Sequence, residues 1–425
     1  MTQTTIEPIS LKRSFSLKKK TYGLGEGSTI NSDELIIDSA RGVFLQDINN
    51  KRYMDLFSQT WSMPLGHNNE NVRKAVLNQM DKVTHLRTAY STKNKSELAQ
   101  RIVELAPAGL TKVNFSLHGS LAVEGAIKLA INNYSDKHKI LYLEDGFHGR
   151  SFATMGISWK IPDCKYNSYF SNGIEVKKNL SDIELKMRTE NPAAIIIELV
   201  QCNAGCKILD KDLVQGIRKL CDKNDVVMII DEVQTAFGCM GKMFLCEDYD
   251  VIPDILVFGK AIGGGYPLAG AIYKDKYYFQ SGEHSFTFGH FPLSMAAGAA
   301  YLKELQTVFR KNPVPRINAQ IKASLESLEN KYEILNNARC IGTKGAIDVL
   351  DLAGRPDSKT ADLIVSKMQQ KGVIIANSRF RGLGNTLMLQ PPIIITSTQL
   401  TSAFAVLAEV IDEISALQVT YDTIY

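Results

Sequence analysis

Short apolar runs recur in the middle of the chain, between about residues 110 and 275, and segments of helical length separate them. Runs that are apolar at consecutive positions are typical of strands buried on both faces. Strands that alternate with helices in this way predict a mostly parallel sheet covered by helices. The predicted strands are Val113–Ser116, Ile140–Leu143, Ala194–Ile197, Val226–Ile230, Ile255–Phe258 and Leu268–Tyr273, and the predicted helices are Ala122–Asn132, Asp210–Asp222 and Leu293–Leu305.

The pattern differs on either side of this region. On the N-terminal side, a hairpin is predicted around Asn49-Asn50, and helices are predicted over Asn71–Val83 and Ser96–Leu105, with Ser96 as an N-cap. On the C-terminal side, helices and strands mix, which predicts a separate α+β unit that the N-terminal hairpin joins. Its predicted helices are Asn318–Glu329, Lys359–Lys371 and Thr398–Leu417, and its predicted strands are Ala346–Leu350 and Val373–Ala376.

The length of 425 residues predicts two or three domains, at roughly 100–200 residues each. We expect an N-terminal segment of a small domain over residues 1–60, a large domain over 61–310 and the rest of the small domain over 311–425. Hydrophobic residues make up 44% of the chain and charged residues 22%, which excludes a disordered chain or a disulfide scaffold. The formal net charge of +4 gives no reason to expect a nucleic-acid partner.

Cysteine spacing and hydropathy bear on location. The seven cysteines show no CxxC spacing, which favours reduced thiols over disulfides or a structural metal. No stretch is apolar over the ~18 residues that a membrane span needs. The basic run Lys18–Lys20 is followed by polar residues rather than by the apolar core of a secretory signal. These features predict a cytoplasmic protein that does not bind membranes.

Ionisable residues stand at the carboxyl ends of three predicted strands. Glu198 follows the strand Ala194–Ile197, Asp231 follows Val226–Ile230, and Lys260 comes shortly after Ile255–Phe258. In open α/β sheets, ligands bind outside the carboxyl ends of the strands. A single charge at a strand end is ordinary, but three charges at the same edge favour a binding site.

Lys260 has the setting of a nucleophilic amine. It follows four apolar residues and a glycine and precedes the glycine-rich run Gly263–Gly265. A lysine held near an apolar floor loses its proton more easily and attacks carbonyls, although a surface lysine before a flexible loop has the same local sequence. An apolar strand ending in Asp-Glu is also typical of P-loop ATPases, but the chain lacks the GxxxxGK[ST] loop that such proteins need.

An anion cradle and an aromatic face fall at the same edge. Gly119 and Ser120 open a predicted helix, where free N–H groups favour phosphate, although Ser120 placed there is also consistent with a simple cap. Phe147 and His148 follow the strand Ile140–Leu143 and offer a flat face and a hydrogen-bonding ring, unless they only pack or face solvent. An amine, a phosphate cradle, a carboxylate and an aromatic face together fit pyridoxal 5'-phosphate.

Two segments carry a resemblance to a known family. The run Ile229–Gly238 and the run Pro253–Leu268 closely resemble the class III pyridoxal-phosphate aminotransferases. Phe147–Arg150, Ser285–Gly289 and Pro391-Pro392 resemble weaker family motifs, and the likeness extends over roughly residues 35–415. The resemblance implies a fold-type I enzyme whose large domain holds a mostly parallel seven-stranded sheet between helices. It also implies a homodimer with shared active sites.

The resemblance also implies roles for individual residues. Lys260 would form the Schiff base with the cofactor and move the proton during transfer, and Asp231 would pair with the pyridinium nitrogen. Val233 and Phe147 would lie on the two faces of the ring. The other implied cofactor-binding residues are Gly119, Ser120, His148, Glu198, Gln234 and Thr287, with Thr287 reaching the partner subunit's site.

The sequence departs from the family pattern where substrates bind. Many members have an arginine three residues before the double proline, where it grips a substrate carboxylate, and this chain has Met388 there. The synthases of diaminopelargonic acid also lack that arginine, so their substrate is an option. The candidate substrate-binding residues are Trp61, Arg150, Arg379 and Arg381.

Three functions are consistent with these residues. The first is an aminotransferase that moves an amino group from a donor to a keto acid or other carbonyl acceptor. The second is a racemase, epimerase or decarboxylase with the same cofactor. The third is a binding protein without catalysis, which has no need of both Lys260 and Asp231. We therefore expect an aminotransferase.

Overall fold

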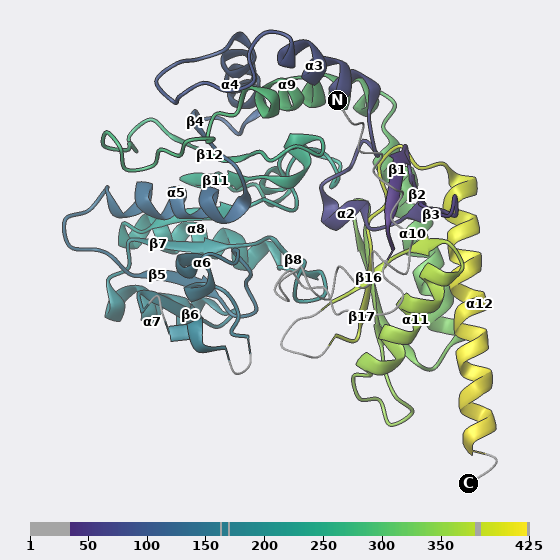
Figure 1. The fold of residues 1–425 in the computed structure, drawn as a ribbon. Coiled ribbons are helices and arrows are strands. Elements are labelled where there is room, and N and C mark those ends of the chain that lie inside the picture. The colour runs from purple at the N-terminus through teal and green to yellow at the C-terminus, as the bar shows by residue number, and fades with distance from the viewer. Residues whose placement is uncertain (1–34, 162–163, 169–170, 379–383, 423–425) are drawn as a thin grey trace.

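A seven-stranded sheet forms the centre of the larger half of the molecule (Figure 1). The computed structural model describes residues 35–161, 164–168, 171–378 and 384–422. The spatial order of the strands is β4-β12-β11-β10-β7-β5-β6, and only β12 runs antiparallel to its neighbours. The bounds are β4 (Leu110–Ser116), β5 (Ile140–Leu143), β6 (Gly173–Val176), β7 (Ala194–Ile197), β10 (Val227–Asp231), β11 (Ile255–Phe258) and β12 (Ala269–Lys274). The predicted α/β class with a mostly parallel sheet is confirmed, whereas β6 was not predicted.

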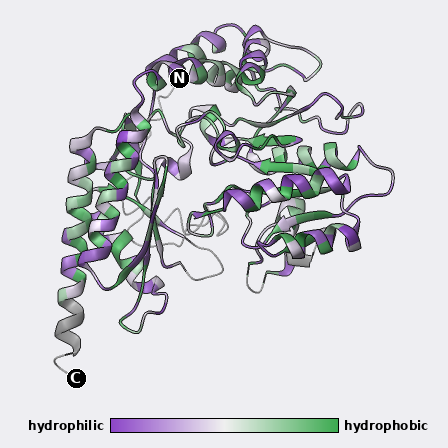
Figure 2. Ribbon diagram, turned by 180° about the vertical axis from the view of Figure 1, so that it is seen from behind, coloured by the Kyte–Doolittle hydropathy of each residue, from purple (hydrophilic) through white to green (hydrophobic). Residues whose placement is uncertain are grey.

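Helices cover both faces of this sheet, as the continuous apolar runs predict. Helix α5 (Gly119–Ile131) packs on the face that carries Ile229. Helices α7 (Leu180–Glu190) and α8 (Lys211–Asn224) pack on the opposite face, which carries Ile230. Figure 2 shows the apolar colour over the central strands and polar colour on the outer sides of the helices.

A further helical layer packs near the β4 edge of the sheet. It consists of α3 (Glu70–Met80), α4 (Lys93–Leu105) and α9 (Pro292–Phe309), with α3 and α4 both packed on α9. The prediction of Ser96 as an N-cap is wrong. Helix α4 begins at Lys93, because the Thr92 hydroxyl accepts the N–H of Lys95 and caps the helix one turn earlier.

The smaller half joins the two ends of the chain. Val373 in β15 pairs in parallel with Met54 in β3, which confirms that the N-terminal hairpin belongs with the C-terminal elements. One sheet has the order β1-β2-β3-β15 and the other β13-β14-β17-β16. The strands are β1 (Ile37–Arg41), β2 (Phe44–Asp47), β3 (Arg52–Asp55), β13 (Leu335–Ile341), β14 (Lys344–Val349), β15 (Val373–Ile374), β16 (Ala376–Asn377) and β17 (Thr386–Leu389), and the helices are α10 (Pro313–Lys331), α11 (Ser358–Gln370) and α12 (Ser397–Asp422).

Several short elements connect the longer ones. They are α2 (Ser58–Trp61), α6 (Phe152–Gly156), β8 (Val200–Gln201), β9 (Lys207–Ile208) and the 3₁₀ turns Lys165–Ser168, Leu245–Tyr249 and Lys260–Gly263. The domain boundaries at residues 60 and 310 stay a prediction. None of the described helices is long and apolar enough to cross a membrane.

Candidate active site

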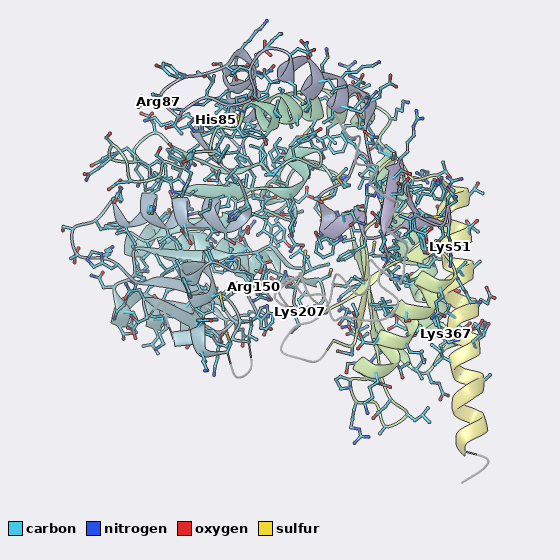
Figure 3. All side chains as sticks on the ribbon, in the orientation of Figure 1. Lys51, His85, Arg87, Arg150, Lys207 and Lys367 are labelled. Carbon is cyan, nitrogen blue, oxygen red and sulfur yellow. The ribbon has the colours of Figure 1, made fainter. Side chains whose placement is uncertain are left out.

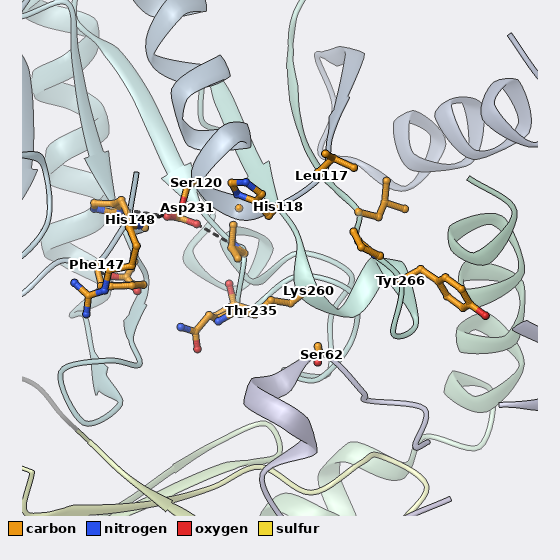
Figure 4. A pocket seen from close by; sticks show the side chains of 18 of the residues that line it. Ser62, Leu117, His118, Ser120, Phe147, His148, Asp231, Thr235, Lys260 and Tyr266 are labelled. Atoms are coloured by element: carbon orange, nitrogen blue, oxygen red, sulfur yellow. Dashed lines mark hydrogen bonds and ion pairs between the residues drawn. The ribbon is translucent and has the colours of Figure 1, made fainter. Parts of the chain in front are cut away.

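The carboxyl ends of the central strands border a cavity of about 430 Å³. Glu198, Asp231 and Lys260 all line it, so the three ionisable residues predicted at one sheet edge do meet. Figure 4 shows Lys260, Asp231 and His148 among the side chains of this cavity. Neighbouring parallel strands end at the same edge, which is why residues far apart in the sequence converge here.

Lys260 is held in a strained backbone conformation at the floor of the cavity. Its φ angle is +46°, a region that residues other than glycine rarely occupy and that clusters at functional sites. Burial, followed by the positive charge of Lys344, lowers the pKa of Lys260 to about 8. Near neutral pH a useful fraction of this lysine is therefore the uncharged amine, which is the nucleophilic form.

Asp231 is fixed by two hydrogen bonds. Its Oδ2 lies 2.8 Å from His148 Nδ1, and its Oδ1 accepts the N–H of Val233 at 3.0 Å. Glu232 points to the opposite face of the strand and accepts the N–H groups of Leu245 and Cys246 in the core. Strand alternation therefore selects Asp231, and not Glu232, as the acid of the cavity.

The start of α5 forms a close-fitting cradle. A Cβ atom on Gly119 would lie 3.1 Å from Val233 Cγ1, so any larger residue there would press on the Val233 side chain. A Cβ on Gly149, whose φ is +132°, would lie 2.2 Å from Ser120 Oγ. Ser120 lies inside the helix, and its hydroxyl accepts the N–H of Arg150 at 3.1 Å. The reading of Ser120 as a simple N-cap is therefore wrong, because the N-cap position belongs to His118.

Phe147 and Arg150 line the cavity together. The Arg150 guanidinium carbon lies 4.6 Å from the centre of the Phe147 ring and 5.1 Å from that of Trp159. Arg150 lies between the large sheet and the smaller half of the molecule (Figure 3). Among the described residues no carboxylate forms an ion pair with this guanidinium, so it is available to a ligand.

Glu198 is buried in the same cavity. Its Oε2 accepts the N–H of Phe147 at 2.6 Å. Burial and the nearby charge of Asp231 raise the pKa of Glu198 well above its usual range. Met388, at the position where the resemblance places an arginine, is buried in β17. Among the residues that the structure describes, no guanidinium pairs with Glu198.

These residues fit pyridoxal phosphate. Gly119 and Ser120 offer N–H groups at the start of a helix of 13 residues. Gln234 Oε1 and His148 Nε2 are buried with no partner among the described residues, as expected for groups that form hydrogen bonds to a ligand. The cofactor requires an amine and an acid, and Lys260 and Asp231 place one of each in the lining of the cavity.

Other predicted residues fall at the margin of the cavity or outside it. Trp61 is buried beside the cavity, and the centre of its ring lies 5.6 Å from Lys260 Nζ. Thr287 is exposed and does not line the cavity. Arg379 and Arg381 lie outside the described residues.

Several residues of the site were not predicted from the sequence. Ser62 and Val200 line the cavity, and Tyr266, Pro267 and Leu268 close another side of it. The glycine-rich turn after Lys260 was a signal for Tyr266, Pro267 and Leu268, because a chain that reverses direction beside a strand end borders the site at that end. Nothing in the sequence indicated Ser62, which follows the short α2 element of the other half.

The chain matches known proteins over nearly its whole length. The family model for aminotransferase class-III matches residues 28–411. An acetylornithine aminotransferase of Caldanaerobacter subterraneus is 32% identical, with 91% of this chain and 97% of that relative covered. An adenosylmethionine-8-amino-7-oxononanoate aminotransferase of Staphylococcus aureus is 30% identical, with 81% and 86% covered.

A solved structure shows the same fold. A transaminase from the marine bacterium Virgibacillus superimposes with a TM-score of 0.87 at 25% identity, covering 95% of this chain and 99% of that one. The family match, the relatives and this superposition agree with the groups that line the cavity, which are the amine of Lys260, the carboxylate of Asp231 and the N–H groups at the start of α5. The chain therefore belongs to the class III aminotransferases, which are fold-type I enzymes that depend on pyridoxal phosphate.

Proposed function

We propose that this aminotransferase works through Lys260 as its covalent and proton-transferring amine, with Asp231 as the acid that faces the cofactor's ring nitrogen. The observation that carries the proposal is the position of Lys260, which lines the same cavity as Asp231 and whose pKa is lowered to about 8 chiefly by burial. When bound, pyridoxal phosphate supplies an aldehyde that takes up the amino group and a ring that withdraws electrons.

Each residue then has a defined task. Lys260 Nζ, as the free amine, takes a proton from the reacting carbon of the substrate and returns it. Asp231 keeps its negative charge directed at the ring nitrogen, and His148 holds its Oδ2 in place at 2.8 Å. Gly119 and Ser120 bind the phosphate through backbone N–H groups. Val233 and Phe147 flank the ring and exclude water.

Arg150 is the proposed anchor for a substrate carboxylate. Its guanidinium is oriented by Phe147 and Trp159 and has no acidic partner among the described residues. The relatives are named for acetylornithine and for 8-amino-7-oxononanoate, and Met388 in place of an arginine favours the second kind of substrate. We propose a carboxylate-bearing substrate whose amino or keto group reacts at a distance from the carboxylate.

A substrate screen tests this function. Purified holoenzyme is mixed with single amino donors, among them N-acetylornithine, S-adenosylmethionine and lysine, with and without a carbonyl acceptor such as 2-oxoglutarate or 8-amino-7-oxononanoate. Turnover that needs both partners supports transamination. Turnover of one amino acid without an acceptor would instead identify a racemase, an epimerase or a decarboxylase.

Replacing Arg150 with glutamine should weaken the binding of acidic substrates. A charge-assisted hydrogen bond contributes about 1.5–3 kcal/mol, so KM should rise about 10- to 100-fold with little change in kcat. Steady-state kinetics with the substrates found in the screen measure this. A neutral amine or aldehyde of similar size is the control, and its KM should stay the same. An equal rise in KM for the neutral compound would contradict carboxylate binding by Arg150.

We also propose a cytoplasmic homodimer with shared active sites. All seven cysteines are free, which supports a reducing compartment. Thr287 is exposed in the single chain and lies outside its own cavity, although the resemblance implies that it binds phosphate. If Thr287 of a second copy of the chain enters this cavity, the position of Thr287 outside its own cavity and its implied contact with the phosphate are both explained.

Mixed dimers test the sharing of sites. Lys260→Ala subunits and Thr287→Ala subunits should each be weakened as homodimers, the first in chemistry and the second in cofactor retention. In a mixed dimer one site carries both defects and the other carries neither, so activity should recover toward half of the wild-type value per dimer. Confirmed heterodimers without any recovery would place Thr287 outside the partner's site.

A further inference from the structure

A second lysine lies buried next to the active site. Lys344 is the first residue of β14, in the smaller half of the molecule, and its side chain is 1% exposed. Its Nζ donates a hydrogen bond to Gln390 Oε1 and lies 3.3 Å from the centre of the Trp61 ring. Among the described residues, no carboxylate forms an ion pair with Lys344.

A buried ammonium without a carboxylate is unfavourable, because it has lost its hydration without gaining a full opposite charge. The face of an indole ring and an amide oxygen compensate for part of that loss. They do not explain why a charge stands here, since an apolar side chain of similar length would fill the same space at lower free energy. This charge therefore suggests a function outside β14.

Trp61 connects this charge to the active site. Lys260 Nζ lies 5.6 Å from the centre of the same ring, so the two lysine nitrogens are at most about 9 Å apart. The backbone of Ser58–Trp61 has positive φ angles throughout, from 47° at Ser58 to 66° at Trp61. Four consecutive residues in this region are strained, and such strain persists where a side chain must be held in one place.

We propose that Lys344 is a positioning residue of this aminotransferase, whose buried charge beside Trp61 disfavours a second positive charge on Lys260 and so keeps Lys260 in its nucleophilic form. The inference rests on the proposed role of Lys260 as the amine of the reaction. A neighbouring cation is a known way to activate a lysine toward carbonyls, in addition to burial in an apolar pocket.

The charged groups around Lys260 do not all act in the same direction. Burial has the largest effect on the pKa of Lys260, and Lys344 lowers it further, whereas Cys202, Asp231 and Glu198 raise it. Cys202 itself is buried. Although burial raises the pKa of its thiol, hydrogen bonding from Cys206 and the charge of Lys344 lower that pKa to about 6. Lys344 and a Cys202 thiolate therefore influence Lys260 with opposite signs.

The size of the effect follows from the separation of the two nitrogens. Two unit charges about 9 Å apart, at an effective dielectric constant of about 20, shift a titration midpoint by roughly one pH unit. Removing the charge of Lys344 should therefore raise the midpoint of Lys260 by about one pH unit. At pH 7.5 the fraction of Lys260 present as the free amine should fall about eightfold.

The experiment titrates Lys260 directly in the full chain freed of cofactor. Formaldehyde, a small uncharged aldehyde that reacts with free amines, is applied briefly between pH 6 and pH 10 together with cyanoborohydride as the reductant. Methylation of the Lys260 peptide is then measured by mass spectrometry. The wild-type midpoint should lie near 8. Lys344→Met should raise it by about one pH unit relative to its parent when both are made in a Cys202→Ala chain, where loss of the Lys344 charge cannot also neutralise a Cys202 thiolate. Lys344→Gln, which keeps a hydrogen-bonding head group, should do the same in that chain if the methionine variant folds poorly. Cys202→Ala should lower it.

Lys137→Met is the matched control. Lys137 is also a largely buried lysine over an aromatic ring, 4.2 Å from the centre of Tyr134, but it lies outside the cavity. Its replacement should leave the midpoint of Lys260 unchanged. A midpoint that does not move in either Lys344 variant would overturn the inference, as would an upward shift in Cys202→Ala.

A separate arm tests the proposed function itself. The wild-type chain is incubated with pyridoxal phosphate and reduced with borohydride, and the labelled lysine is identified. Labelling of another lysine would overturn the role of Lys260, whatever the titration shows. Labelling at Lys260 with an unmoved midpoint in the Lys344 variants would leave the proposed function in place and remove only the role of Lys344.

Discussion

Replacing Lys260 with alanine should give a folded protein that holds no covalently attached pyridoxal phosphate and has no detectable aminotransferase activity. Lys260 is the one lysine that lines the cavity of the described chain, and its lowered pKa of about 8 makes its amine available near neutral pH. No other described side chain there can replace an amine toward an aldehyde. The visible absorbance of the holoenzyme should disappear, and borohydride should fix no cofactor to the variant.

The controls separate a lost amine from a damaged fold. Lys137→Ala removes a lysine from the segment between α5 and β5 and should keep both colour and activity. Thermal melting should show that Lys260→Ala remains folded, because the deleted side chain faces the cavity. A borohydride-reducible adduct on a different lysine of the variant would show that Lys260 is not the attachment site.

Most of the large sheet was predictable because its strands are buried on both faces. The strands β7, β10 and β11 each consist of four or five consecutive buried residues, and such runs stand out in any sequence. The edge strand β6, Gly173–Val176, was missed because it contains a glycine and an exposed glutamate. An edge strand needs less apolar surface, and its sequence resembles that of a loop.

The acids of the site were predictable from their place at the carboxyl ends of strands, but their partners were not. Asp231 and Glu232 face opposite sides of the chain, so only one of them can reach the cavity. The contact between Asp231 and His148 joins residues 83 positions apart. His148 lies in a loop after β5, and only the three-dimensional path of that loop brings its ring to the acid.

Lys344 shows the limit of reading local sequence. A lysine at the first position of a strand is usually solvated, and the neighbouring residues of β14 give no contrary sign. Its burial arises from Trp61 and Gln390, which come from segments far away in the chain. The substrate cannot be read from local sequence either, because the shape of the cavity depends on side chains from many elements.

Asparagine in place of Asp231 should reduce kcat about 10²- to 10³-fold while most of the cofactor remains bound. The proposed task of this carboxylate is electrostatic, because it stabilises positive charge on the ring nitrogen while electrons move toward the ring. Loss of one preorganised partner of this kind has about that effect on rate. Asparagine has nearly the same shape, and its Oδ1 can still accept the N–H of Val233, so the local structure should persist. Single-turnover kinetics of the first half-reaction, together with a cofactor-binding titration, measure the two effects separately.

The neighbouring acid supplies the matched control for this variant. Glu232 is fully buried on the other face of the strand end, where its carboxylate accepts two backbone N–H groups and the Thr235 hydroxyl. Glu232→Gln should therefore lower the melting temperature, since glutamine cannot accept all three hydrogen bonds equally well, while the rate per folded molecule changes little. Asp231→Asn should show the reverse, with a slow reaction in a stable protein. A near-normal rate in Asp231→Asn would mean that the charge facing the ring nitrogen comes from another group, and Glu198, the remaining carboxyl of the cavity, would be the next to test.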